Sequence, residues 1–187
     1  MKPILKNFPT EFTTDRLLIR MPKPGDGKAM FEAIHASLDE LKPWLPFAHF
    51  NQKEEDVEVN IREAHLKFLS REDLRLLVFL KDSGNLIASS GLHRINWEIP
   101  KFEIGYWIDT RYAGKGYMTE AVNGITDFAV KELKARRVEI RCDTRNTKSA
   151  AIPERLGFTL EGILRNDSLE IGSTTSLRDT SVYAKIF

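Results

Sequence analysis

The stretch from Phe102 to Glu120, FEIGYWIDTRYAGKGYMTE, decides the fold, because it carries strand, glycine-turn and helix signals in immediate succession. Its first part is aromatic and β-branched up to Ile108, a composition that favours a strand. Gly114 and Gly116 carry no Cβ atom, so the backbone there can bend and the amide N–H groups of residues 113–118 can converge. The sequence therefore predicts a strand that runs into an anion-binding turn.

The turn leads into a predicted amphipathic helix from Tyr117 to Leu133. Apolar residues recur there at positions i, i+3, i+4 and i+7, namely Met118, Ala121, Val122, Ile125, Phe128 and Ala129. The positive N-terminal end of this helix faces the turn, and phosphate is the anion expected to bind there. Two better-known phosphate loops are excluded, since Thr119 replaces the third glycine of the dinucleotide fingerprint and no hydroxyl residue follows Lys115 as in a P-loop.

Two motifs together resemble those of the GCN5-related N-acetyltransferases. Arg111 to Gly116, RYAGKG, is similar to motif A, which holds the pyrophosphate of acetyl-CoA in that family. Asn146 to Phe158, NTKSAAIPERLGF, is similar to motif B, an Asn, a short helix and a Leu-Gly-Phe that opens a strand. The strand EIGYWI, the ending PERLGF and Trp44-Leu45-Pro46 look most like the branch of ribosomal-protein N-terminal acetyltransferases.

Length and charge narrow the class of protein. A chain of 187 residues with 42% hydrophobic residues supports one domain, residues 1–187, with a sizeable core. The 28 Lys and Arg almost balance the 27 Asp and Glu, so no global field recruits nucleic acid or an anionic membrane. The lone Cys142 cannot form an internal disulfide, and nothing resembles a signal peptide or an 18-residue apolar span. These features favour the cytoplasm.

The resemblance implies an α/β (α+β) fold: a mixed, mostly antiparallel twisted sheet of about seven strands, splayed in the middle, with helices on both faces. Residues 1–13 are predicted to be an extended arm, and Asp26 a helix cap. Strands are expected at Thr14–Arg20, Leu74–Leu80, Leu86–Ile95, Phe102–Ile108, Arg137–Asp143, Phe158–Arg165 and Leu177–Ile186. Further helices are expected at Lys28–Leu38, Glu54–Leu69 and Ser149–Leu156.

The donor implied by the resemblance is acetyl-CoA, and the backbone after Tyr106 would pair with its pantetheine arm. The residues expected to bind it are Trp107, Ile108, Arg111, Ala113, Gly114, Lys115, Gly116, Tyr117, Met118, Asn146 and Lys148. Arg145 is expected, with Lys148, near the adenosine end. No metal is expected, because the four histidines lack metal-ligand spacing.

Three residues are candidates for the chemistry. Glu103 is expected to be the general base, because the family often has a carboxylate in this strand; a solvated strand glutamate is the alternative. The tyrosine that many family members use as thiolate donor is replaced by Pro153, so Ser149 is expected in that role, with a helix N-cap as the alternative. Asn146 would orient the cofactor or a water. Strict alternation makes Cys142 a small core residue.

The acceptor is expected to be a primary amine, and the pKa values of amines favour the α-amino terminus of a protein. Trp44, Phe47, His93 and Tyr183 are the expected substrate residues. An α-amino group with a pKa near 7.8 is neutral in about one molecule in seven at pH 7, whereas neutralising a lysine costs roughly 4.6 kcal/mol. A small-molecule amine acceptor and a non-catalytic CoA sensor remain alternatives, and the resemblance suggests a homodimer paired through edge strands.

Overall fold

The structure, a computed structural model, describes residues 2–187 and contains one eight-stranded sheet in the order β1-β2-β3-β4-β5-β6-β8-β7. Only β5 and β6 pair in parallel, so the mixed, mostly antiparallel sheet predicted from the sequence is confirmed. The strands are β1 Glu11–Thr13, β2 Leu17–Arg20, β3 Leu74–Leu80, β4 Leu86–Asn96, β5 Lys101–Ile108, β6 Arg137–Asp143, β7 Thr159–Leu169 and β8 Leu177–Ile186.

The sheet has one strand more than expected. Residues 11–13 were predicted to lie in an extended arm, but they pair with β2, where Phe12 lies opposite Ile19. The ring of Phe12 stacks on Phe128 with ring centroids 4.8 Å apart. This contact between distant parts of the chain holds β1 in place, and no periodic pattern in so short a segment signals it.

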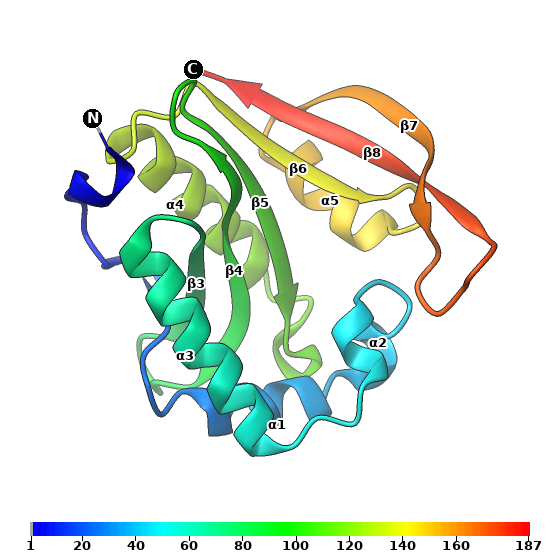
Figure 1. Cartoon of the computed structure of the whole chain (residues 1–187), viewed down its shortest axis with the longest axis horizontal. Coiled ribbons are helices and arrows are strands. Elements are labelled where there is room, and N and C mark those ends of the chain that lie inside the picture. The colour runs from blue at the N-terminus through cyan, green and yellow to red at the C-terminus, as the bar shows by residue number, and fades with distance from the viewer. Residues whose placement is uncertain (1) are drawn as a thin grey trace.

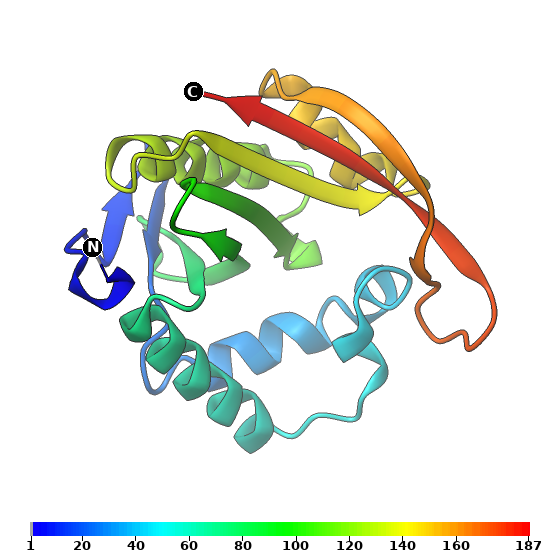
Figure 2. The ribbon, with the colours of Figure 1, turned by 45° about the horizontal axis from the view of Figure 1, so that its top comes forward.

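Helices cover both faces of the sheet, as predicted (Figures 1 and 2). One face carries α1 Gly27–His35 and α3 Glu54–Ser70, joined through the short α2 Leu38–Leu41; the other carries α4 Tyr117–Lys131 and α5 Thr147–Arg155. Three short 3₁₀ helices complete the chain: η1 Pro3–Leu5, η2 Pro46–His49 and η3 Thr110–Tyr112.

The helix expected at residues 28–38 is split at Ser37. Ser37 is fully buried, and its hydroxyl oxygen accepts a hydrogen bond from the amide of Thr110 at 2.9 Å. A serine that binds a distant backbone group in this way competes with continuation of the helix. The contact ties the α1–α2 junction to the end of β5.

Asp26 does not cap α1 with its side chain, so that prediction was wrong. Its carboxylate instead accepts hydrogen bonds from the guanidinium of Arg20, at 2.7 and 2.8 Å, and from the amide of Lys23. Glu58 of α3 binds the amide of Gly27, at the start of α1, at 2.9 Å. The N-terminus of α1 is therefore satisfied by a neighbouring helix, a partner that local sequence cannot identify.

Two apolar layers fill the space between sheet and helices. Ala121, Val122 and Ile125 of α4 pack on one face, while Met30 and Ile61 of α1 and α3 pack on the other. The strands β3 and β4 lie between these layers and are largely buried, as expected for central strands covered on both faces.

The two parallel strands separate soon after they begin. Only residues 101–103 of β5 pair with residues 137–139 of β6. Figure 1 shows the two strands side by side at one end and diverging toward the other. We call the wedge that opens beyond Glu103 and Glu139 the slot, and its presence confirms the splayed sheet expected from the resemblance.

Candidate active site

The turn that links β5 to α4 has the geometry of an anion-binding nest. Gly114 and Gly116 have φ angles of +77° and +79°, in the left-handed region that favours glycine. A Cβ atom on Gly114 would meet nothing within 4 Å, so the hollow in front of the backbone is open. We use the name nest for residues 114–119.

The amides of the nest are available to a ligand. Within residues 2–187, the N–H groups of Gly114 to Thr119 donate to no other group of the chain, and the first amide of the helix to do so belongs to Glu120. The sequence placed the free amides at residues 113–118, but the amide of Ala113 donates to Thr110 at 3.2 Å. The number of free amides, six, is the number predicted, but they belong to residues 114–119 rather than 113–118.

Arg16 braces the nest from outside. One guanidinium nitrogen donates to the carbonyl of Lys115 at 3.1 Å, and Nε donates to Glu120 at 2.6 Å. Burial alone would raise the pKa of Glu120, but hydrogen bonds from Thr14 and Arg16 outweigh this and lower it below its ordinary value. The carboxylate therefore stays ionised and fixes β2 to the first turn of α4.

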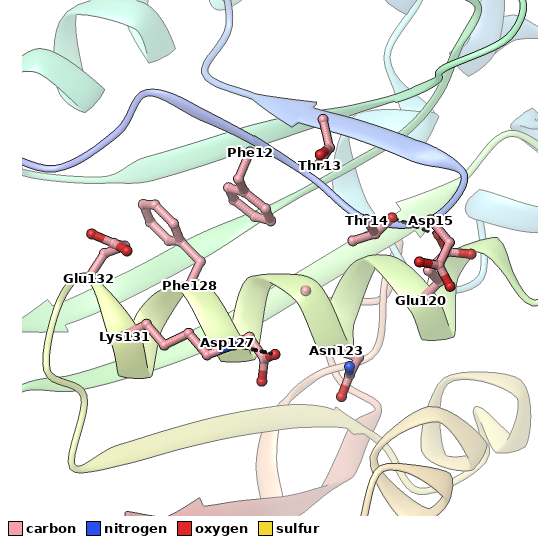
Figure 3. Close-up of a pocket in the computed structure, with 11 residues that line it drawn as sticks. Phe12, Thr13, Thr14, Asp15, Glu120, Asn123, Asp127, Phe128, Lys131 and Glu132 are labelled. Carbon is pink, nitrogen blue, oxygen red and sulfur yellow. Dashed lines mark hydrogen bonds and ion pairs between the residues drawn. The ribbon is translucent and has the colours of Figure 1, made fainter.

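A shallow hollow of about 390 Å³ lies beside this brace, between β1 and the outer side of α4. Figure 3 shows Thr14 bonded to Glu120 at one end of it and Lys131 paired with Asp127 further along α4. Of its charged groups, Glu120 is paired with Arg16, and Asp127 is paired with Lys131. No candidate catalytic residue lies in its wall, and we assign it no chemistry.

Both splayed strands end in the same tripeptide, Asp-Thr-Arg, at residues 109–111 and 143–145. Asp109 and Asp143 are buried, and each carboxylate is bound by the arginine two residues later, at 2.5 and 2.7 Å. Arg145 also binds Glu170. Both arginines were expected to supply free charge to the donor, but their guanidinium groups are occupied with neutralising buried carboxylates.

Lysines supply the cations that remain near the nest and the start of α5. Lys115 and Lys148 are exposed, and neither makes an ion pair with the described residues. The Lys115 ammonium lies 5.6 Å from the centroid of the Tyr112 ring. The predicted cationic contribution of these two residues is therefore physically available.

A pair of hydroxyl groups spans the slot. Tyr106 of β5 donates to the carbonyl oxygen of Ser149 in α5 at 2.8 Å, and the Ser149 hydroxyl donates to the Tyr106 oxygen at 3.3 Å. Asn146 is the N-cap of α5, and its side chain accepts from the amide of Ser149 at 3.0 Å. Asn146 therefore does the capping that was considered for Ser149, and the hydroxyl of Ser149 is left for other contacts.

Burial keeps the groups of the slot uncharged. It raises the pKa of Tyr106 above its ordinary value, an effect that the hydrogen bond with Ser149 only partly opposes. It also raises the pKa of Cys142 to about 11. A thiol with so high a pKa is a poor nucleophile at neutral pH, in agreement with the interpretation of Cys142 as a packing residue.

A cavity of about 520 Å³ opens on the α1–α3 side of the sheet, and we call it the β4–β5 cavity. Tyr106 lies in its wall as well as in the slot, so the two spaces meet at this residue. Its apolar wall is Met30, Ile34, Leu45, Phe47, Val57 and Trp107; its polar wall is Gln52, Asp56, Asn60, Arg75, Ser89, Ser90 and His93, with Gly105 at the floor.

His93 is held in this cavity by Asp73, which the sequence gave no reason to select. Nδ1 of His93 lies 2.7 Å from the Asp73 carboxylate. Because a carboxylate only accepts, Nδ1 carries a hydrogen and Nε2 of the neutral ring is an acceptor. Nε2 lies 3.6 Å from the place that a Cβ atom on Gly105 would occupy. The imidazole thus covers β5 where the slot opens.

The other predicted acceptor residues divide into two groups. Phe47 lies in the cavity wall with Trp107, their ring centroids 6.0 Å apart, so the Trp107 side chain faces the cavity rather than the slot. Trp44 does not line the cavity; its neighbour Leu45 does. Tyr183 is 4% exposed and donates to Glu154 at 2.9 Å. Its expected contact with the acceptor is contradicted, because its ring packs in the core.

Glu103 lies at the vertex of the slot, in the last residue pair between β5 and β6. Its side chain is 18% exposed and lies 3.5 Å from Nε of Arg94. It is not part of the cavity wall, although its strand neighbours His93 and Gly105 are. This carboxylate therefore has access to solvent and one loose ion pair.

Two negative findings concern residues 2–187. No helix in this part of the chain is long and apolar enough to cross a membrane. Nor do any three His, Cys, Asp or Glu side chains of these residues gather closely enough to hold a metal ion.

Comparison with known proteins decides the family. The model of the acetyltransferase (GNAT) domain matches residues 16–159. The chain belongs to the GNAT acetyltransferase family. As a member of this family it is an N-acetyltransferase that uses acetyl-CoA, and the open nest, with its free amides, fits the diphosphate of that donor.

Relatives of this GNAT chain lie in the predicted branch. It is 34% identical over 155 residues to the "Putative ribosomal N-acetyltransferase YdaF" of Bacillus subtilis (strain 168), covering 81% of this chain and 82% of that protein. It is 26% identical over 164 residues to the ribosomal-protein-serine acetyltransferase of Escherichia coli (strain K12), covering 85% and 86%.

A solved structure shares the fold of this GNAT chain. It is that of RimL, a ribosomal L7/L12 alpha-N-protein acetyltransferase, in complex with coenzyme A. The TM-score is 0.85 at 20% sequence identity, covering 93% of this chain and 96% of the other. At this identity the likeness concerns the fold alone.

Proposed function

We propose that this GNAT enzyme acetylates the α-amino group of a protein or peptide, with a ribosomal protein as the class of acceptor. The names of the two sequence relatives support this class. The observation that carries the proposal is that Tyr106 belongs both to the wall of the β4–β5 cavity and to the slot, so an amine bound in this cavity lies next to β5.

The cavity suits an amine that is easily neutralised. An α-amino group costs roughly 1 kcal/mol to deprotonate at pH 7, against roughly 4.6 kcal/mol for a lysine. The proton acceptors near the slot are single groups, Glu103 and the Asp73-held His93, rather than a cluster of carboxylates. One such acceptor is adequate for the α-amino group and poorly matched to a lysine.

On the donor side, the chain contributes mainly backbone. Acetyl-CoA supplies the acetyl group as a thioester. The amides of Gly114 to Thr119 would hold its diphosphate, with Lys115 and Lys148 adding charge. The edge of β5 beyond Glu103 has no strand partner and offers its backbone groups to the rest of the donor.

Glu103 remains our choice for the general base. It lies at the vertex of the slot, and strand alternation puts its side chain on the same face as His93 and Trp107. Since Glu103 does not line the cavity, it would accept the proton through a water.

Ser149 and Tyr106 are the proposed hydrogen-bond donors to the leaving sulfur. Pro153 removes the tyrosine that motif B usually supplies, and Tyr106 brings a phenol to the slot from β5 instead. Its raised pKa keeps the phenol protonated at neutral pH, so it is always able to donate. This pairing was not predicted from the sequence, which singled out the backbone after Tyr106 and not its hydroxyl group.

The cavity wall disfavours a polyamine acceptor. The acidic side chain in the cavity wall is that of Asp56, and Arg75 adds a positive charge to the same wall. A polyamine would have to bring several positive charges next to that guanidinium. The observed wall therefore favours an acceptor with one amine.

The test is to incubate the purified protein with acetyl-CoA and peptides that carry both a free N-terminus and an internal lysine. We expect release of free CoA, and mass spectrometry should locate the acetyl group on the α-nitrogen. N-terminally blocked copies of the same peptides are the matched control and should not react. Acetylation confined to the lysine, or CoA binding without turnover of any amine, would refute the proposal.

A further inference from the structure

Arg75 is the group in the β4–β5 cavity that the proposed chemistry does not use. It interrupts the apolar strand LRLLVFL and lies partly buried in the cavity wall. Its Nε donates to Ser89 at 3.0 Å, and a terminal nitrogen donates to the side-chain oxygen of Asn60 at 2.6 Å. The other terminal nitrogen lies 3.9 Å from the sulfur of Met30.

All of these partners are neutral. Among residues 2–187, no carboxylate forms an ion pair with Arg75 within 4.0 Å. Asp73, which acts on Arg75 through its charge, is occupied by His93, and Asp56 in the same wall accepts a hydrogen bond from the amide of Lys53. The contrast with Arg111 and Arg145, which both bind buried carboxylates, is sharp. A partly buried cation without a counter-ion is costly unless something else supplies the negative charge.

The position of Arg75 relates it directly to the reacting amine. Arg75 lies opposite Gly91 on β4, and Gly91 lies opposite Gly105 on β5. A Cβ atom on Gly91 would come within 3.0 Å of both Arg75 and the ring of His93, so this row must lack side chains. The ring of His93 packs over Gly91 and Gly105, so the imidazole lies along this row between the edge of β5 and the Arg75 residue.

The distance between β5 and the Arg75 side chain suits a small substituent on the amine. The Arg75 side chain reaches Ser89 on β4, and Ser89 lies opposite Trp107 on β5. Neighbouring strands are roughly 5 Å apart. An aspartate or glutamate at the N-terminus of a peptide has its carboxylate three or four bonds from its α-nitrogen, which covers a distance of this size.

We infer that Arg75 is an anion subsite of the acceptor cavity and that the preferred acceptor amine carries a carboxylate close to it. This inference rests on the proposed function, which assigns an amine as the acceptor. It adds that the molecule bearing the amine also carries a carboxylate. The planar guanidinium fork matches a carboxylate in two hydrogen bonds. The carboxylate belongs either to an acidic first residue of a peptide or to a free amino acid.

The experiment compares matched acceptors with the wild-type enzyme. Peptides of one sequence that begin with Asp or Glu are paired with peptides that begin with Asn or Gln, and free glutamate is paired with its α-amide. We expect kcat/KM to be about 10- to 100-fold higher for the acidic member of each preferred pair. The peptide arm and the free amino acid arm show which source of carboxylate the cavity takes.

Variants then assign the preference to Arg75. In Arg75→Gln the acidic and neutral peptides should react at similar rates, while acetyl-CoA affinity by calorimetry stays unchanged. Arg75→Lys should retain part of the preference, because it keeps the charge and loses the fork. Arg62→Gln, at an exposed arginine of α3 bound to Glu58, is the matched control and should keep the full preference.

Equal rates for acidic and neutral acceptors with the wild-type enzyme overturn the subsite and leave the proposed function standing. A preference that survives in folded Arg75→Gln also overturns it. The wild-type comparison decides the question even if Arg75→Gln does not fold. Failure of every peptide and amino acid to react is a different result, because it refutes the proposed function itself.

Discussion

The nest and the β4–β5 cavity both adjoin β5, yet they are made from different parts of the chain. The nest consists of consecutive backbone amides, from Gly114 to Thr119, presented by one turn and one helix end. The cavity consists of side chains from α1, the η2 segment, α3, β3, β4 and β5. The nest is local in sequence, whereas the β4–β5 cavity exists only after the sheet, α1 and α3 have assembled.

This difference teaches which parts of the enzyme tolerate change. A site made of amides depends on backbone shape, so most side-chain substitutions around it are harmless and a substitution at a left-handed glycine is not. A site made of side chains changes with each residue of its wall. The donor site is therefore suited to one constant ligand, and the cavity to an acceptor that differs between relatives.

The largest effect is expected on the cavity side, from Glu103→Gln. If this carboxylate accepts the proton, kcat should fall by on the order of 10²–10⁴ and the acid limb of the pH–rate profile should disappear. His93→Gln is the matched comparison and should cost about tenfold at most. The reverse ranking would transfer the role of base to the imidazole held by Asp73.

On the nest side, Gly116→Val tests whether backbone shape is the whole of the donor site. The valine would have to adopt a φ of +79° and would crowd the hollow, so acetyl-CoA affinity should drop at least about 100-fold, or roughly 2.7 kcal/mol. Calorimetry measures this directly. Gly84→Val imposes the same strain, at φ +71°, in the β3–β4 turn outside the nest and should leave the affinity intact. Equal losses in both variants would mean that strain, not the nest, is responsible.

At the border between the two regions, Tyr106→Phe removes one hydroxyl of the pair that spans the slot. We expect kcat to fall about tenfold, with a larger loss for thioesters that have poor leaving groups. Ser149→Ala should behave alike, and the double variant should be little worse than either alone, because the two hydroxyls act together. Additive losses would show that the two groups work independently.

The smallest effect on activity is expected at the base of the slot, from Glu139→Gln. Burial tends to raise the pKa of Glu139, but hydrogen bonds from Lys101 and Arg137 outweigh this and lower it below 4.5. Because the folded-state pKa of Glu139 is depressed, its interactions with Lys101 and Arg137 stabilise the protein above pH 4.5. This contribution is lost as the pH falls through the folded-state pKa.

Urea unfolding of Glu139→Gln should therefore show a loss of about 1–3 kcal/mol at pH 7 that shrinks toward pH 3. The turnover rate at pH 7 should change less than threefold, about 0.6 kcal/mol. A stability difference that does not depend on pH would show that the ionised carboxylate is not what holds β5 and β6 together at this end.

Much of the fold was predictable from local pattern. The bounds of β3, β6 and β8 agree with the sequence prediction, because each strand has a clear composition and a clear stop. The errors share one cause. Glu11–Thr13 became a strand, Ser37 broke a helix and Asp26 turned away from its cap because a partner far along the chain competed for the same groups.

The site divides in the same way. Gly114, Gly116 and Asn146 could be selected in advance, since consecutive residues form the nest and the α5 cap. Asp73, Arg75 and Tyr106 could not be connected to it, although an arginine inside an apolar strand was a signal that could have been noticed. The ion pairs of Arg111 and Arg145 with the buried aspartates were not predicted, because a side chain's partner depends on packing.

The sequence by itself determined the family, the donor and the backbone that receives it, because those depend on residues that are neighbours in the chain. Only the tertiary structure decided which side chains face the acceptor, since β3, β4, β5, α1 and α3 must pack before Arg75, His93 and Trp107 share one cavity. Spacing along a strand fixes a side chain's face, and only packing fixes what lies opposite it.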